Sequence, residues 1–266
     1  MKKFLNDPVH FVDEMLEGIY KAHPAVTYAA GDKRCLVTAK TKPGKVGIAT
    51  GGGSGHLPLF LGYVGDGMLD GCAVGGVFQS PSAEQMYQVT KHIDQGAGVL
   101  YIYGNYSGDI INFDMAAELA DLDGIAVKQV VGNDDVASSV VGEEHKRRGV
   151  AGIFFVYKAA GAAADAVIDE MMERIFAEQD YKAGDSVAVL VNGLGGTPME
   201  ELYILFRRVS ELLEGRGVTA KHVWVGEFAT AMEMAGASVS ILHLDEELDR
   251  LVAAPANTPF FKHIAG

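Results

Sequence analysis

Cysteine is scarce in this chain, with only Cys35 and Cys72 among 266 residues. The sequence also has no C-x-x-C pair and no pair of histidines at metal-ligand spacing. A disulfide framework and a structural zinc site are therefore disfavoured. We expect the chain to bind no metal.

Long uncharged apolar runs are missing as well. Lys158 and Asp165 interrupt the best candidate before it reaches the roughly 18 residues of a membrane-spanning helix. Asp7 lies where a secretory signal peptide would need its apolar core. We therefore expect a cytoplasmic protein with no membrane contact.

Basic residues are fewer than acidic residues. The chain has 22 lysines and arginines against 35 aspartates and glutamates, which gives a net charge of -13. Such a charge disfavours binding to nucleic acids and anionic membranes, and the only dense basic run is 145–148. We expect neither as a partner.

Glycine, in contrast, is abundant. The 33 glycines among 266 residues are about one residue in eight, against a usual fraction of about 7%. They gather in short clusters after predicted strands, which indicates functional loops rather than a low-complexity sequence.

The apolar pattern predicts alternating strands and helices. This alternation is typical of α/β folds with mostly parallel sheets. We expect two layered α/β domains, over residues 1–165 and 166–266. The main strands are expected over 44–50, 99–103, 126–131, 152–157, 187–191, 221–225 and 237–244, and the main helices over 8–22, 82–93, 113–120, 159–179, 199–214 and 245–251.

The stretch ATGGGSGHLP, residues 49–58, follows the first of these strands. It does not fit a Walker loop, a dinucleotide-binding loop or a nucleophile elbow, because His56 stands where each pattern requires another residue. The glycines around Ser54 favour a backbone cradle for a small ligand. His56 is the one group there with a reference pKa near neutrality, about 6.5. The alternative is a tight turn in which the histidine serves only as a cap.

A second polar loop, Asn105 to Asp109, follows the strand over 99–103. Ligands of open α/β sheets lie beyond the carboxyl ends of the strands, so this loop and the glycine loop are expected on one rim. There Asp109 could accept a proton from a substrate hydroxyl, or it could be a helix N-cap or an Asx turn. The polar stretches 133–135 and 192–198 could likewise hold a ligand or be simple turns.

Six motifs together resemble the dihydroxyacetone kinase substrate-binding subunit family. They are GGGSGH at 51–56, VFQSP at 77–81, NYSGD at 105–109, NDDV at 133–136, RRGVAG at 147–152 and LVNGLGGTPMEELY at 190–203. The resemblance implies a two-domain α/β fold, usually homodimeric, that binds short ketoses and carries no cofactor of its own. A separate subunit would hold ATP or ADP with magnesium, and a phospho-carrier subunit recharges the ADP in one branch of the family.

The resemblance also implies roles for single residues. Gly53, Ser54 and Gly55 would line the ketose, His56 would hydrogen-bond it and assist proton transfer, and Asp109 would take the proton of the hydroxyl that is phosphorylated. The chain would thus be a kinase subunit that needs a partner subunit. Because the family includes coactivators that bind dihydroxyacetone without phosphorylating it, a ketose sensor is the alternative.

Three departures from the family pattern stand out. Gly104 occupies a position where the family often has lysine, and Leu57 one where it often has glutamate, which could indicate another ketose such as erythrulose. The family's G-I-H-G-E-P-G loop, whose histidine bonds covalently to the substrate carbonyl, has no counterpart at the junction Ala166-Val167. Either the deletion is real and shortens the second domain, or the natural chain has a further segment here. We expect the latter, since the apolar stripe of 167–176 breaks with the small-residue run before it.

Overall fold

The computed structural model describes residues 5–140, 142–163 and 181–264. The junction Ala166-Val167 and most of the helix predicted over 159–179 lie outside these ranges. Within them, the fold is α/β, as predicted, with one sheet of six strands, one of three and a two-stranded hairpin.

The first sheet has the strand order β1-β2-β4-β3-β5-β6. Its last four strands in this order run parallel, and β1 and β2 join the β4 edge in antiparallel orientation. The parallel strands β3, β5 and β6 confirm the sequence prediction, whereas β1 and β2 were not predicted. The strands are β1 (Val26–Tyr28), β2 (Cys35–Thr38), β3 (Gly47–Gly52), β4 (Gly71–Val74), β5 (Val99–Gly104) and β6 (Val127–Gly132).

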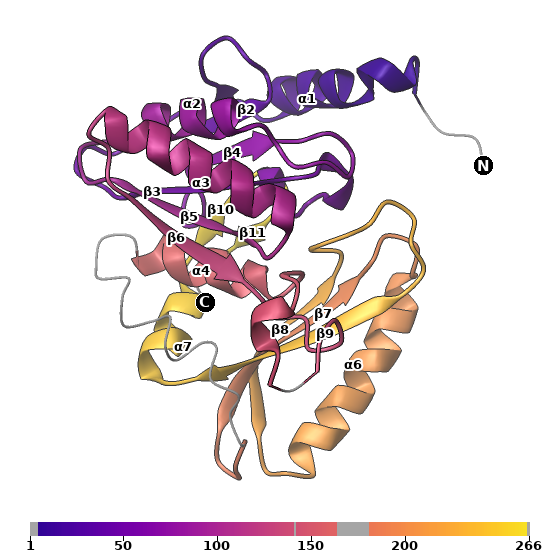
Figure 1. Cartoon of the computed structure of the whole chain (residues 1–266). Coiled ribbons are helices and arrows are strands. Elements are labelled where there is room, and N and C mark those ends of the chain that lie inside the picture. Colours follow the sequence, from indigo (N-terminus) through magenta and orange to yellow (C-terminus); the bar gives the residue numbers. More distant parts are fainter. Residues whose placement is uncertain (1–4, 141, 164–180, 265–266) are drawn as a thin grey trace.

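Helices cover both faces of this sheet (Figure 1). One buried cluster joins α2 (Ala83–Ile93) and α3 (Ser107–Leu122) to one face. A second cluster joins α1 (Phe11–Ala22) and α4 (Ile153–Ala163) to the other face. A capping box begins α2, where Ser82 and Gln85 exchange hydrogen bonds.

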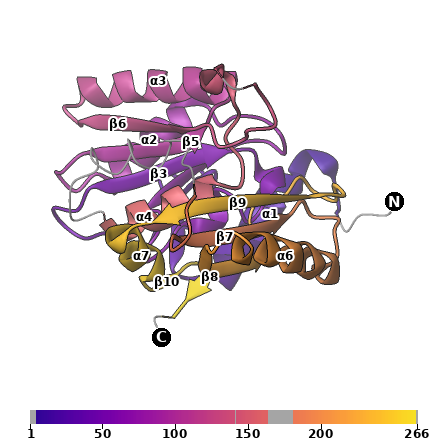
Figure 2. The same ribbon diagram turned by 90° about the horizontal axis from the view of Figure 1, so that it is seen from below.

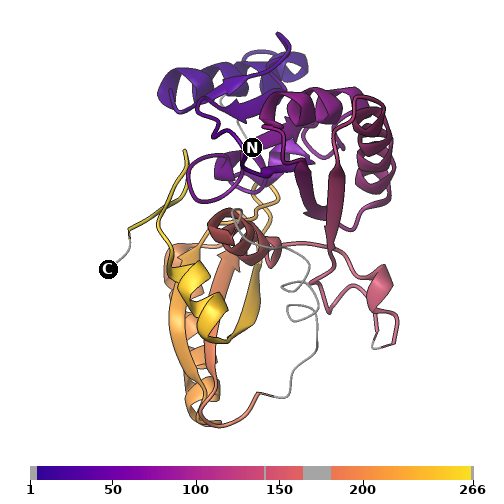
Figure 3. The same ribbon diagram turned by 90° about the vertical axis from the view of Figure 1, so that its left-hand side faces the viewer.

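The strand predicted over 152–157 is wrong, because these residues begin α4. The run Ile153 to Tyr157 is buried without the alternation of a one-sided strand, since α4 lies between the two sheets (Figure 3). A short apolar run of this kind does not by itself distinguish a buried strand from a buried helix. The segment before α4 is fixed by Asp134, whose carboxylate accepts hydrogen bonds from the amides of Val150 and Gly152.

The second sheet has the order β8-β7-β9, with β8 parallel and β9 antiparallel to β7. Helix α6 covers one face through a small apolar cluster, while α4 and α7 lie on the other face (Figure 2). This sheet is thus only half parallel. Its elements are β7 (Ser186–Gly193), α6 (Met199–Glu214), β8 (Thr219–Gly226), β9 (Ala237–Leu244) and α7 (Glu246–Ala253).

The last described residues return to the first sheet's side of the molecule. They form the hairpin of β10 (Ala256–Asn257) and β11 (Lys262–His263). The amide of Asn257 donates to the carbonyl of Asp66 over 2.9 Å, and the hydroxyl of Thr258 donates to the carbonyl of Gly62 over 2.8 Å.

The division into two domains at residue 165 stays a prediction from the sequence. Among the described residues, no helix is long and apolar enough to cross a membrane.

Candidate functional site

The two predicted site loops leave neighbouring strands. β3 and β5 pair in parallel, with Ala49 opposite Tyr101, while β4 lies on the other side of β3. The chain therefore changes direction across the sheet between β3 and β5. Open α/β sheets usually bind their ligands at the carboxyl ends of such strands, and this place between the two loops is here called the crevice. The glycine loop follows β3, and the loop that ends at Asp109 follows β5, as expected.

The turn 75–79 packs so closely against the first loop that the loop requires glycines at the points of contact. A β-carbon at Gly53 or Gly55 would lie 2.7 Å from the carbonyl oxygen of Val77. The amides of Ser54 and Gly55 donate hydrogen bonds to the carbonyls of Gly76 and Val77. These two amides are thus already occupied, which corrects the prediction of an open backbone cradle.

His56 ends this loop and is half-buried between two aromatic rings. Its ring centroid lies 5.2 Å from that of Phe78 and 6.2 Å from that of Phe60. Its Nδ1 atom lies 2.5 Å from the carbonyl oxygen of Thr230. Because a carbonyl oxygen only accepts hydrogen bonds, Nδ1 carries a hydrogen whether the ring is neutral or charged. Nε2 is therefore the atom whose proton can be exchanged.

Asp109 lies in the first turn of α3 and is 6% exposed. It is not the N-cap of this helix, since that position belongs to Tyr106, so the capping alternative is wrong. Burial raises the pKa of Asp109, while the nearby Ser80 and His56 partly oppose the rise. A carboxylate with a raised pKa is a better proton acceptor than a solvated one.

Two buried oxygen atoms lack a hydrogen-bond partner in the part of the chain that the structure describes. They are Oδ1 of Asp109 and the hydroxyl oxygen of Ser54. Buried polar atoms without partners are uncommon and are often completed by a ligand or water. Both belong to residues predicted to line the ketose, and their loops border the same crevice.

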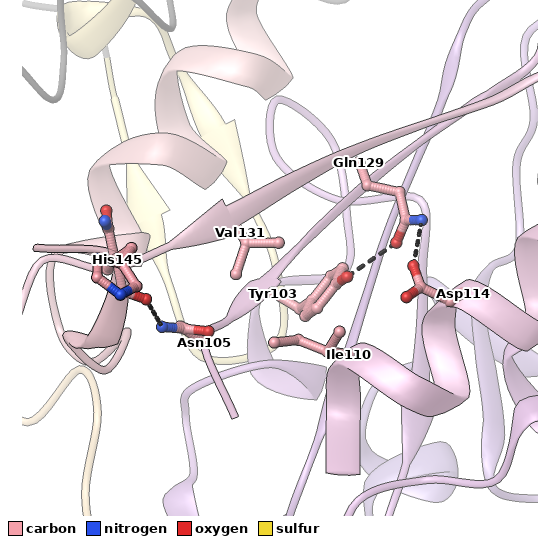
Figure 4. A pocket seen from close by; sticks show the side chains of 8 residues that line it. Tyr103, Asn105, Ile110, Asp114, Gln129, Val131 and His145 are labelled. Carbon is pink, nitrogen blue, oxygen red and sulfur yellow. Dashed lines mark hydrogen bonds between the residues drawn. The ribbon is translucent and has the colours of Figure 1, made fainter. Parts of the chain in front are cut away.

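A cavity of about 330 Å³ lies beside this crevice, between α3 and the end of β6 (Figure 4). Its wall includes Tyr103, Asp114 and Gln129, which are joined in a row by hydrogen bonds. Asn105, also in the wall, donates to the carbonyls of His145 and Arg147 and so holds the basic run in place. The cavity contains neither His56 nor Asp109.

The motif NDDV has a structural role in the described structure. Asp134 binds the amides of Val150 and Gly152, and Asp135 accepts a hydrogen bond from the amide of Ala137. NDDV and RRGVAG are thus paired with each other. No group of three or more potential metal ligands occurs in the described ranges.

Gly104, the position where the family often has lysine, is tightly packed. A β-carbon here would lie 2.9 Å from the carbonyl oxygen of Gly149 and 3.0 Å from the ring of Tyr106. A lysine at this position would displace the Tyr106 ring or the neighbouring backbone. The close packing around Gly104 is therefore consistent with the absence of a lysine at this position.

Sequence reasoning missed Thr230 and Ser80, which contact His56 and Asp109. Ser80 lies in the VFQSP motif, so the motif pointed to the right segment. Thr230 lies in a loop with no recognisable pattern, and only the fold brings it to His56, 174 residues earlier in the chain.

Comparison with known proteins is consistent with this geometry. The Dak1 domain matches residues 17–168 and 163–260. The chain belongs to the Dak1 domain family. It is 37% identical to the dihydroxyacetone-binding subunit of PTS-dependent dihydroxyacetone kinase 2 of Listeria innocua, over 98% of this chain and 99% of that protein.

Two further proteins are similar to this chain. D-erythrulose kinase of Mycolicibacterium smegmatis is 34% identical over the whole of this chain and 58% of its own length. The solved structure of a dihydroxyacetone kinase operon co-activator superposes with a TM-score of 0.84 at 27% identity, and covers 94% of this chain and 98% of its own.

Proposed function

We propose that this chain is the ketose-binding subunit of a dihydroxyacetone-type kinase. It presents dihydroxyacetone, or a related short ketose such as erythrulose, for phosphorylation. The observation that carries this proposal is the buried Asp109, with one unpartnered oxygen, close to a His56 whose Nε2 is available for proton exchange.

The chemistry follows from these two groups. His56 hydrogen-bonds the ketose and holds it in the crevice, while Asp109 accepts the proton of the hydroxyl group. The oxygen of that hydroxyl then bonds to the phosphorus of the donor, and the bond between phosphorus and the leaving phosphate oxygen breaks. Positioning of the acceptor and removal of its proton are the main contributions that phosphoryl transfer requires from this side.

The phosphoryl donor belongs, in this proposal, to a separate subunit that holds ATP or ADP with magnesium. A phospho-carrier subunit would recharge ADP in the second case. The glycine loop supports this division, because it ends in Gly55-His56-Leu57 instead of the Gly-Lys-Ser/Thr of a phosphate-binding loop. The amides of Ser54 and Gly55 are also bonded within the protein, so they are not available to hold a phosphate.

A ketose-sensing coactivator is the second candidate. It is favoured by the close superposition of the co-activator structure over almost the whole chain. A sensor needs the crevice and His56, but it does not need a proton acceptor for the substrate hydroxyl. The buried Asp109 therefore favours the kinase.

The second domain is proposed to have a further segment in the natural chain, inserted at Ala166-Val167. The match to the Listeria innocua subunit extends over 331 positions, 65 more than the 266 residues of this chain. The two parts of the Dak1 match meet at residues 163–168. The first observation supports additional residues in the natural chain, and the second supports their position at the predicted junction. A homodimer in the cytoplasm stays a prediction from the sequence.

The experiment is a reconstitution. The purified chain is incubated with dihydroxyacetone, ATP and magnesium, first alone and then with a nucleotide-bearing subunit of the ATP-dependent or the phospho-carrier class. We expect a phosphate ester only in the presence of one of these subunits. Turnover by the chain alone would contradict the two-component proposal, and ketose binding without turnover in any mixture would identify the sensor.

A further inference from the structure

The motif LVNGLGGTPMEELY contains a second glycine loop, 193–197, to which neither the crevice nor the proposed chemistry assigns a role. The loop follows Asn192, the penultimate residue of β7. Asn192 is only 1% exposed. The loop does not border the crevice directly. It packs instead against the segment 228–236, which connects β8 to β9.

The Asn192 side chain holds the beginning of that segment through three hydrogen bonds. Its Oδ1 atom accepts from the amides of Phe228 and Ala229, each over 2.8 Å. Its Nδ2 atom donates to the carbonyl of Ala229 over 2.8 Å, and to the hydroxyl of Ser238 over 3.3 Å. One side chain thus fixes both the amide and the carbonyl of the residue just before Thr230.

The glycines of the motif allow close packing at the other end of the segment. A β-carbon at Gly195 would lie 1.7 Å from the carbonyl oxygen of Met232, and one at Gly196 would lie 2.5 Å from that of Glu233. Backbone hydrogen bonds join the two segments, from Ala231 to Leu194 and from Gly196 to Met234. The motif therefore supports the 228–236 segment along its length.

The supported segment in turn holds the glycine loop of the crevice. The amides of Thr230 and Met232 donate to the carbonyls of His56 and Gly55, over 3.2 and 3.1 Å. The Thr230 hydroxyl donates to the carbonyl of Leu57 over 2.7 Å. The carbonyl of Thr230 accepts from Nδ1 of the His56 ring over 2.5 Å.

We propose that Asn192 is a positioning residue for His56, which acts through the carbonyl of Thr230. Asn192 fixes residues 228 and 229, so that the Thr230 carbonyl is directed at Nδ1 and the exchangeable position of the ring is Nε2. The expected effect of Asn192 on turnover rests on the proposed function, whereas its expected effect on the His56 ring does not.

The direct test is NMR of the imidazole nitrogens of His56 in the whole chain, without ligand. We expect the neutral ring of the unchanged protein to carry its hydrogen on Nδ1. Asn192→Ala is expected to give a mixture of the two tautomers. Asn192→Asp, which keeps the acceptor for the two amides, is expected to give a smaller change.

Ser238→Ala is the matched control. It removes the other partner of Asn192 Nδ2 and leaves the bonds to residues 228 and 229 in place. We expect its His56 ring to match that of the unchanged protein. Thermal unfolding of all variants separates loss of folding from loss of ring position.

The second test is kinetic and uses the reconstituted kinase. A misplaced group can cost about 100-fold, so we expect Asn192→Ala to lower kcat/KM for the ketose by about 10- to 100-fold. This loss is expected mainly as weaker ketose binding, since His56 holds the ketose. In a chain that already carries His56→Ala, the same substitution should lower kcat/KM little further, because a residue that acts through His56 has no further effect once the ring is absent.

Three outcomes would overturn the proposal. They are an unchanged tautomer in folded Asn192→Ala, additive losses in the double variant, and failure of both Asn192 variants to fold, which would assign Asn192 to folding alone. A changed tautomer in a chain that supports no kinase reaction with any partner would instead contradict only the proposed function.

Discussion

The side chain of Ser80, in the turn after β4, lies beside the carboxylate of Asp109 in the first turn of α3. Burial raises the pKa of Asp109, whereas Ser80 lowers it and so stabilises the ionised carboxylate. The balance between the two sets the pH range in which Asp109 can accept a proton.

Ser80→Ala should therefore shift the acid side of the kinase's pH profile. Asp109 must be ionised to act as a base, so turnover falls as the pH drops through its pKa. Loss of the Ser80 hydroxyl raises this pKa further, and the acid limb is expected to move to higher pH. Ser82→Ala is the control, because it removes only the cap of α2 and should destabilise the fold by about 1 kcal/mol without moving the limb.

Asp109→Asn and His56→Ala should have different effects. Asp109→Asn keeps the shape of the side chain but removes the base, so turnover with the partner should fall by about 100- to 10,000-fold while ketose binding persists. His56→Ala should mainly weaken ketose binding, measured by calorimetry. Asp114→Asn, an exposed carboxylate on the same helix, is the control. Normal turnover by Asp109→Asn would exclude that residue as the base.

Alanine should have opposite effects at two glycines. At Gly53 its β-carbon would lie 2.7 Å from the Val77 carbonyl oxygen, so Gly53→Ala should destabilise the protein by about 1–3 kcal/mol. At Gly18, within α1, nothing lies within 4 Å, and Gly18→Ala should stabilise it by about 0.5–1 kcal/mol. Urea unfolding measures both. Equal effects at the two positions would contradict the close packing of the glycine loop.

Lys158 should make stability depend on alkaline pH. Its side chain is fully buried and donates to the carbonyl of Ala254 at the end of α7, and burial lowers its pKa from 10.5 to about 8. Between these two values the unfolded chain binds more protons at this group than the folded chain, so its contribution to stability rises with pH across that window. The slope for one proton is at most about 1.4 kcal/mol per pH unit.

Lys158→Met isolates this contribution, because tyrosines and cysteines with raised pKa values oppose it in the whole protein. The free energy of unfolding of the unchanged protein, minus that of the variant, should increase from pH 8 to pH 10.5. A difference that stays constant over this range would show that Lys158 is not held in its buried position.

The mass of the natural protein tests the proposed insertion at Ala166-Val167. We expect an intact mass above 28.3 kDa and, after borohydride treatment with bound ketose, a covalent adduct on the additional segment. A mass of 28.3 kDa without an adduct would show that the deletion is real and that the ketose is bound without a covalent bond.

Apolar runs and helical periodicity predicted most of the fold. The central strands β3, β5 and β7 are short runs that are buried almost throughout. The strand β9 (Ala237–Leu244) and the helix α6 (Met199–Glu214) have the predicted bounds. The errors fell where a buried run fits both a strand and a helix, or where an element is very short. The beginning of α4 is buried on all sides, and the short strands β1 and β2 hold too few residues to show a period.

The sequence predicted the site residues but not their surroundings. His56 and Asp109 follow recognisable glycine loops, and the parallel sheet brings those loops together. The role of Thr230 depends on a contact with His56, 174 positions earlier in the chain, and that of Asn192 on contacts 36 and 37 positions later, which no local pattern records. The glycines at 53 and 55 predict space for a ligand beside the backbone, but the turn 75–79 occupies part of this space.

The bond between His56 and Thr230 spans 174 positions of the chain, and this has a consequence for biosynthesis. The strands β1 to β6 are all translated before the segment that directs the His56 ring. A nascent chain can thus build its first sheet and crevice early, while the ring stays undirected until translation has passed residue 230. The site is completed only after residue 230 has been synthesised, so a product that stops before this residue would lack an ordered histidine even where its first sheet has folded.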